Sequence, residues 1–125
     1  MRAFIFPGQG SQSVGMGAAL AAASPVARHI FEEVDEALGQ ALFRLMSEGP
    51  EADLTLTENA QPAIMANALA TLRVLEKEGG IEIAAKADAV AGHSLGEYSA
   101  LSAVGAFDLP TTARLLKTRG QAMQA

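Results

Sequence analysis

Apolar and polar residues are arranged along the chain in two ways, one typical of short buried strands and one of amphipathic helices. Two short apolar runs, at residues 2–6 and 87–91, have the length and composition of strands. The helical pattern predicts helices at residues 18–23, 24–38, 41–47, 60–78, 95–104 and 111–123. Residues 51–58 are more polar and are predicted to form a connection. Because strands alternate with helices, we expect one α/β layer structure with a mostly parallel sheet.

Residues with known capping preferences mark the ends of these helices. Ser24 followed by Pro25 is a typical helix start, and Gly39 is a typical end. In the long helix, Pro62 is expected in the first turn, where its missing N–H has no intrahelical partner to lose. The residues expected to face the core are Val26, Ile30, Val34 and Leu38 in helix 24–38, and Ile64, Ala68, Leu72 and Leu75 in helix 60–78.

The segment Gly92-x-Ser94-x-Gly96 lies between the second strand and a helix, as in a nucleophile elbow. The turn is tight, so small residues must stand two before and two after the serine. It would raise the Ser94 Oγ above the end of the strand, where the next helix presents N–H groups and partial positive charge. The amide of Leu95 is then a candidate oxyanion donor. The motif alone also arises by chance in a chain rich in Ala and Gly, so the flanking elements support this interpretation. The small residues on the following helix, which would let it lie close on the sheet, are Gly96, Ser99, Ala100 and Ala103.

A second glycine-rich loop, at residues 7–17, follows the first strand. A dinucleotide-binding loop would read G-x-G-x-x-G, whereas the glycines here are Gly8, Gly10 and Gly15, and no P-loop lysine follows. Nucleotide binding is therefore the weaker interpretation. In an elbow enzyme the second oxyanion donor comes from another strand-to-helix loop, and Gln9 is the candidate for that donor here.

Composition excludes several classes of protein. The 125 residues include no cysteine, which excludes a disulfide framework, a thiolate nucleophile and a Cys-type zinc site, and no metal site is expected. The net charge is -5, and nine basic residues scattered among fourteen acidic ones suggest no nucleic-acid partner. No apolar run reaches the ~18 residues of a membrane span, and the first apolar run is too short for a secretory signal. We therefore expect a cytoplasmic protein without a membrane partner.

Four segments stand out when they are taken together: residues 6–12 (FPGQGSQ), Gln61-Pro62-Ala63, residues 92–97 (GHSLGE) and Arg119-Gly120. In this combination the chain closely resembles the malonyl-CoA:acyl carrier protein transacylase family of bacterial fatty-acid synthesis. The resemblance covers essentially all 125 residues. It implies an α/β-hydrolase-like large subdomain with a short parallel sheet and flanking helices. Residues 1–125 would be the N-terminal part of that subdomain, and the ferredoxin-like small subdomain of the family is absent from this chain.

The resemblance also implies roles for particular residues. Ser94 would be the acylated nucleophile, and the amides of Gln9 and Leu95 would form the oxyanion hole. Arg119 would bind the free carboxylate of the malonyl group, a task suited to a planar guanidinium, although without the resemblance it would be interpreted as a surface charge. Malonyl would pass from coenzyme A to Ser94 and then to the phosphopantetheine thiol of acyl carrier protein, in a ping-pong reaction. The implied partners are malonyl-CoA and acyl carrier protein. Coenzyme A thioester would be a substrate rather than a bound cofactor, and the protein would be monomeric.

A serine nucleophile needs a base, and the chain has two histidines. His93 adjoins Ser94, but neighbouring side chains diverge across an elbow, so we expect His93 to line the pocket or to pack. His29 is interpreted as a solvated residue on helix 24–38. In the family, the base histidine lies well downstream. The chain is therefore expected to be the first part of a longer enzyme and to be inactive by itself.

Two other functions share the elbow. One is the acyltransferase domain of a polyketide synthase, which downstream sequence would distinguish, although a strand starting directly after Met1 favours a stand-alone enzyme. The other is a serine hydrolase, which an ester-hydrolysis assay would distinguish. The basic residues Arg114, Lys117 and Arg119 do not all share one face of the last helix, so no docking surface for acyl carrier protein is predicted.

Overall fold

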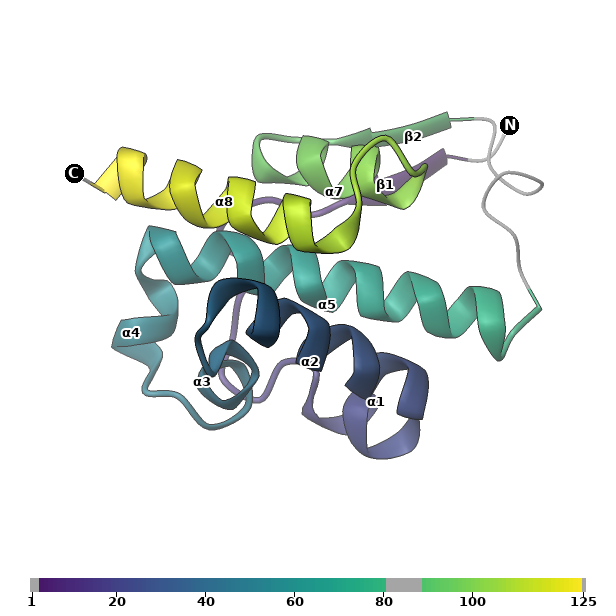
Figure 1. Cartoon of the computed structure of the whole chain (residues 1–125), viewed down its shortest axis with the longest axis horizontal. Coiled ribbons are helices and arrows are strands. Elements are labelled where there is room, and N and C mark those ends of the chain that lie inside the picture. Colours follow the sequence, from purple (N-terminus) through teal and green to yellow (C-terminus); the bar gives the residue numbers. More distant parts are fainter. Residues whose placement is uncertain (1–2, 81–88, 125) are drawn as a thin grey trace.

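The computed structural model describes residues 3–80 and 89–124. Its elements, in chain order, are β1 (Ala3–Phe6), α1 (Ala18–Ala23), α2 (Pro25–Leu38), α3 (Leu42–Glu48), α4 (Glu51–Thr55), α5 (Thr57–Lys77), β2 (Ala89–Gly92), α7 (Leu95–Ala103) and α8 (Leu109–Gln124). The two strands lie side by side with α7 against them, α5 and α8 run through the middle, and α1 to α4 lie on the far side of α5 (Figure 1). No helix among the described residues has both the length and the apolar character needed to cross a membrane.

The described strands form a parallel pair, as predicted. The backbone of Phe4 is level with that of Val90, and Phe6 is level with Gly92. Residues 2, 87 and 88 of the predicted strands lie outside the described residues. Ile5 is 77% exposed, so this small sheet leaves apolar surface uncovered. The chain thus has an α/β fold with a short parallel sheet and mostly helices.

The central helix, α5, is buried on more sides than its apolar pattern predicts. It contacts α2, α7 and α8, and all residues from 59 to 66 are buried, including polar Gln61. Ile64 and Leu72 are buried as predicted. The other two predicted positions are wrong, because Ala68 is only partly buried and Leu75 is 42% exposed. Apolar residues repeated every four positions predict a helix that is packed on one face only, whereas α5 is packed on several faces.

Helix α2 has the predicted bounds, but its buried face differs from the prediction. The Ser24 hydroxyl accepts a hydrogen bond from the Ala27 N–H at 3.4 Å, as expected of an N-cap. The residues of α2 that are buried are Ala27, Phe31 and Val34. Of the predicted face only Val34 is fully buried, because the larger Phe31 ring turns inward and stacks on Phe43 with ring centroids 4.6 Å apart.

The prediction that residues 51–58 form a polar connection is wrong. They contain the short helix α4 and the first two residues of α5. Glu51 and Asp53 suit the positive end of a helix, and Leu54 anchors α4 because it is fully buried. Since α5 starts at Thr57, Pro62 lies in its second turn and not, as predicted, in its first.

Close backbone contacts fix the last two helices. The predicted small-residue face of α7 is confirmed, and a Cβ on Gly96 would collide with the Phe6 carbonyl oxygen. Helix α8 begins two residues before the predicted start, with Pro110 in its first turn, where proline is tolerated. A Cβ on Gly120 would lie 2.5 Å from the Glu58 Cα, so α8 touches the backbone at the start of α5.

This contact reverses the usual effect of replacing a helical glycine. By helix propensity alone, Gly120→Ala would stabilise α8 by about 1 kcal/mol. Because the added methyl would overlap α5, we expect the free energy of unfolding to fall instead, by about 1–3 kcal/mol, the usual cost of overpacking. Denaturant unfolding of the protein that carries this chain measures the change. Thr118→Ala, at an exposed position of α8, is the control and should change the stability little. A stabilised Gly120→Ala variant would contradict the close contact.

The backbone at Ser94 gives a second test. Ser94 has φ 58° and ψ -118°, the one non-glycine positive φ among the described residues. Such a conformation costs a residue with a Cβ about 1–3 kcal/mol. Ser94→Gly and Ser94→Ala both remove the hydroxyl, but only glycine removes the strain, so Ser94→Gly should be the more stable of the two. Parallel denaturant unfolding of the two variants checks this, and equal or reversed stabilities would argue against a strained elbow.

Candidate active site

Ser94 stands at the turn between β2 and α7, as the elbow motif predicts. The turn is closed by two backbone hydrogen bonds, from the Gly96 N–H to the His93 carbonyl and from the Glu97 N–H to the Ser94 carbonyl, both 3.0 Å long. A Cβ on Gly92 would overlap the Gly96 backbone, so the position two before the serine has no room for a side chain. The serine is therefore held by the backbone at the amino end of α7, where the helix dipole favours negative charge.

The guanidinium of Arg119 lies beside the serine hydroxyl. Its Nη2 donates to the Ser94 Oγ at 2.9 Å, and its Nη1 donates to the Gln61 Oε1 at 2.7 Å. The Cζ of Arg119 also lies 5.6 Å from the centre of the Tyr98 ring, within the range of a cation–π contact. The structure thus brings together Ser94 and Arg119, which are 25 residues apart in the sequence. None of the ion pairs found in the described part of the chain includes Arg119.

The start of α8, the helix that carries Arg119, is capped by the residue that precedes it. The Asp108 carboxylate accepts the Thr111 N–H at 2.8 Å, and the Asp108 carbonyl accepts the Thr112 hydroxyl. Hydrogen bonds to the Asp108 carboxylate from the side chain and the backbone N–H of Thr111 hold the pKa of that carboxyl below its ordinary value. An ionised carboxylate at this end of a helix also interacts favourably with the helix dipole. These bonds stabilise the first turn of α8, at the end of the helix remote from the serine.

Of the two predicted oxyanion donors, Leu95 lies in the elbow itself and Gln9 lies in the loop after β1. Leu95 is fully buried and is the first residue of α7, so its N–H belongs to the turn that has no intrahelical carbonyl partner. Gln9 lies in the loop after β1, which approaches the elbow closely, since a Cβ on Gly8 would be 3.0 Å from the His93 carbonyl oxygen. The Gln9 side chain is exposed and donates to the Thr57 hydroxyl at 3.2 Å, which ties this loop to the start of α5.

Neither histidine forms a hydrogen bond with the Ser94 side chain among the described residues. His93 and His29 are both exposed, and among the described residues the hydrogen bond to the Ser94 Oγ comes from Arg119. The His93 ring lies near Gly8, with its Nδ1 3.9 Å from where a Cβ would stand. Within residues 3–80 and 89–124 there is no group of three or more His, Asp or Glu side chains that could hold a metal ion.

Three residues that contact the predicted site residues Arg119 and Gln9 were not themselves predicted as site residues. Gln61 was noted only as part of a motif, yet its fully buried amide accepts a hydrogen bond from Arg119. Tyr98, whose ring faces the Arg119 guanidinium, and Thr57, whose hydroxyl accepts a hydrogen bond from Gln9, were not predicted either. A polar residue inside the apolar run at 60–66 was the available signal for Gln61, because a buried amide needs a partner.

The chain is similar to several known proteins. It is 46% identical to the malonyl CoA-acyl carrier protein transacylase of Escherichia coli (strain K12) over 98% of this chain and 38% of that protein. It is 44% identical to the polyketide biosynthesis protein PksE of Bacillus subtilis (strain 168), over 98% of this chain and 15% of that protein. The chain thus spans about two-fifths of the length of the transacylase relative.

Solved structures that resemble this chain include proteins of the same kind as these relatives. An acyl-carrier-protein-S-malonyltransferase from Bartonella henselae superposes with a TM-score of 0.97 at 56% identity, over all of this chain and 40% of that one. A type II PKS acyl-carrier protein in complex with its malonyl-transacylase gives a TM-score of 0.90 at 45% identity, over 98% of this chain and 38% of that one. These matches confirm the resemblance predicted from the motifs. The family described as acyl transferase domain matches residues 3–125, and the chain belongs to that family.

Proposed function

We propose that this chain is the nucleophile-bearing part of a malonyl-CoA:acyl carrier protein transacylase. The observation that carries the proposal is the 2.9 Å hydrogen bond between the Arg119 Nη2 and the Ser94 Oγ. A serine on an elbow suits acyl transfer, and a cation beside it suits an acyl group that carries its own negative charge. Residues 1–125 would form the N-terminal part of the large, α/β-hydrolase-like subdomain of such an enzyme.

Arg119 has donors to spare for a carboxylate. A guanidinium has five N–H groups, and two of them are used in the bonds to Gln61 and Ser94. The Arg119 side chain is also only partly buried. Arg119 forms no ion pair with another of the described residues. We therefore assign the free carboxylate of the malonyl group as the ion partner of its guanidinium.

The first half-reaction would transfer malonyl from coenzyme A to the enzyme. The Ser94 Oγ attacks the thioester carbonyl, and its proton passes to a base supplied by residues outside this chain. The tetrahedral oxyanion is held by the N–H groups of Gln9 and Leu95, each donor of this kind being worth about 10²–10³ in rate. The C–S bond then breaks, the coenzyme A sulfur leaves and takes up the proton, and malonyl remains as an ester on Ser94.

The second half-reaction would pass malonyl to the phosphopantetheine thiol of acyl carrier protein. The base removes the proton of that thiol, the sulfur attacks the Ser94 ester, and the Oγ leaves and recovers its proton. Coenzyme A thioester is thus a substrate of the enzyme and not a resident cofactor. Because the base is assigned to residues beyond this chain, residues 1–125 by themselves should not turn over.

A second candidate function differs only in the carrier protein. The similarity to PksE, and to a malonyl-transacylase in complex with a type II PKS acyl-carrier protein, favours transfer in polyketide synthesis as this alternative. The serine chemistry is the same in both. Comparing kcat/KM with a fatty-acid and a polyketide carrier protein as acceptor distinguishes the two.

The covalent step can be tested on the full-length protein that carries this chain. Incubation with malonyl-CoA and no acceptor should add one malonyl group, and mass spectrometry of the digested protein should locate it on the peptide containing Ser94. Ser94→Ala should remain unmodified. Malonyl on another residue, or on the Ser94→Ala protein, would overturn the assignment. Rapid release of free malonate without any acceptor would indicate a hydrolase instead.

Arg119 and Gln61 provide a test of the selectivity. Arg119→Ala should lower kcat/KM for malonyl-CoA by roughly 10- to 100-fold, because a charged hydrogen bond contributes about 1.5–3 kcal/mol. Transfer from acetyl-CoA should fall far less. Gln61→Glu should have a similar effect although Arg119 is still present, because a carboxylate at position 61 would pair with the guanidinium and compete with malonyl.

Gln61→Met is the matched control for that substitution, since it removes the hydrogen bond without adding a charge. It should weaken malonyl transfer less than Gln61→Glu does. If Arg119→Ala and Gln61→Glu both keep the malonyl-to-acetyl ratio of the unmodified enzyme, Arg119 does not bind the malonyl carboxylate.

A further inference from the structure

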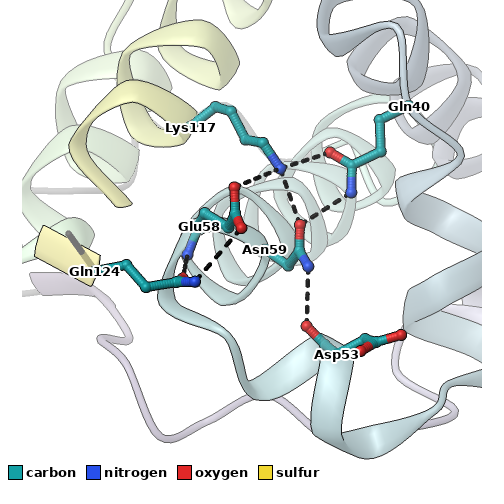
Figure 2. A network of polar contacts seen from close by, with 6 residues as sticks. All are labelled: Gln40, Asp53, Glu58, Asn59, Lys117 and Gln124. Carbon is teal, nitrogen blue, oxygen red and sulfur yellow. Dashed lines mark hydrogen bonds and ion pairs between the residues drawn. The ribbon is translucent and has the colours of Figure 1, made fainter. Parts of the chain in front are cut away.

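We propose that Lys117 is a positioning residue, which holds α8 at one rotation on α5 so that Arg119 reaches Ser94. Its ammonium lies in a network of polar contacts beside the start of α5 (Figure 2). The inference rests on the proposed function, because its consequence is the selectivity that Arg119 provides. Lys117 itself touches neither Ser94 nor Gln61 among the contacts of the described residues.

Two polar links join the same stretches of the two helices. The Lys117 Nζ donates to the Asn59 Oδ1 at 2.9 Å, and two residues further along both helices the Arg119 Nη1 donates to the Gln61 Oε1 at 2.7 Å. Residues two apart on a helix point about 200° away from each other. The two links therefore cannot lie on the same side of the helix–helix contact.

The point of closest approach lies between the two links. Gly120 packs on Glu58, and on a helical wheel these residues fall between the linked positions of their own helices. If α8 rolled about its axis in one direction it would stretch the Lys117 link, and in the other direction it would stretch the Arg119 link. With the Lys117 link intact, the guanidinium of Arg119 is confined to one place beside the serine.

The Lys117 ammonium is held by two hydrogen bonds and one ion pair. It donates to the Gln40 Oε1 at 2.8 Å as well as to Asn59, and it lies 3.7 Å from the Glu58 Oε2. Two of the three N–H groups of the ammonium are thus used in hydrogen bonds, and the Glu58 carboxylate lies within ion-pair distance of its charge. Its side chain is only 21% exposed, so the contacts are partly shielded from water. A cation that is hydrogen-bonded to two amide oxygens and paired with a carboxylate inside the protein is better suited to hold a helix than to bind a ligand.

The network also connects α8 to elements outside α5. The Asn59 Nδ2 donates to the Asp53 carbonyl at 2.9 Å in α4, and the Gln40 Nε2 donates to the Asn59 Oδ1 at 2.9 Å from the loop before α3. At the end of α8, the Gln124 Oε1 accepts the Glu58 N–H at 3.2 Å. Figure 2 shows the Asn59 side chain between Lys117, Gln40 and Asp53. Helix α8 is therefore linked directly to α5 and to the loop before α3, and through Asn59 to α4.

The experiment measures the ratio of kcat/KM for malonyl-CoA to that for acetyl-CoA in the full-length enzyme. Lys117→Met keeps the apolar stem and removes the ammonium. We expect the ratio to fall about 10-fold, less than the ~100-fold that a 1 Å misplacement can cost, while acetyl transfer changes less than about twofold. Lys117→Arg, which keeps a cation and donors, should restore most of the ratio. Lys77→Met, at the other end of α5, is the matched control and should leave the ratio unchanged.

A double mutant separates positioning from mere stability. In an Arg119→Ala background, Lys117→Met should not lower the ratio further, since the residue it positions is gone. An unchanged ratio in Lys117→Met, even with a lower melting temperature, would overturn the proposal, and so would an equal fall in the Arg119→Ala background. If Lys117→Met does not fold, Gln40→Leu removes one acceptor from the same ammonium, and a ratio that stays unchanged there would count against the proposal. An unmodified enzyme without malonyl preference, or one whose preference survives Arg119→Ala, would instead refute the proposed function and this inference with it.

Discussion

Gly120 lets α8 lie against the backbone at the start of α5, and this contact determines where the cation of the site stands. With a side chain at position 120 the two helices would separate, and Arg119 would move away from Ser94. The polar links on both sides of the contact also fix the rotation of α8 about its own axis, since apolar packing alone allows a helix to roll. A site built from α7 and α8 therefore depends on a helix, α5, that supplies a buried amide and no reacting group.

The other side of the site is built from backbone rather than from side chains. The elbow needs glycine at positions 92 and 96, because the strand, the turn and α7 approach so closely that a Cβ has no space at either place. The result is a serine with positive φ, a strained conformation that the surrounding packing maintains. Rigid placement of this kind suits acyl transfer, in which the donors of an oxyanion hole must be in place before charge develops.

The sequence predicted those parts of the protein that depend on local chemistry. Ser24-Pro25 marked the start of α2, and the G-x-S-x-G motif predicted the strand, turn and helix around Ser94. What it could not predict depends on packing between distant segments. The inward turn of Phe31 requires Phe43, and the burial of Gln61 requires α8, so neither follows from the spacing of apolar residues. Arg119 was assigned from a motif, but its distance from the serine hydroxyl is set by the contact at Gly120.

A cation beside the nucleophile has two consequences under the proposed function. It attracts an acyl group that ends in a carboxylate, and it also disfavours one that does not. An uncharged acyl chain packed against Arg119 would shield the guanidinium from water without giving it an ion partner, and an unsatisfied buried polar group costs about 1–3 kcal/mol, more when charged. Selectivity would thus come from the penalty on the wrong substrate as well as from the gain on the right one. The partners that already hold Arg119, which are Gln61 and the Tyr98 ring, increase that penalty because they prevent the guanidinium from turning away toward solvent.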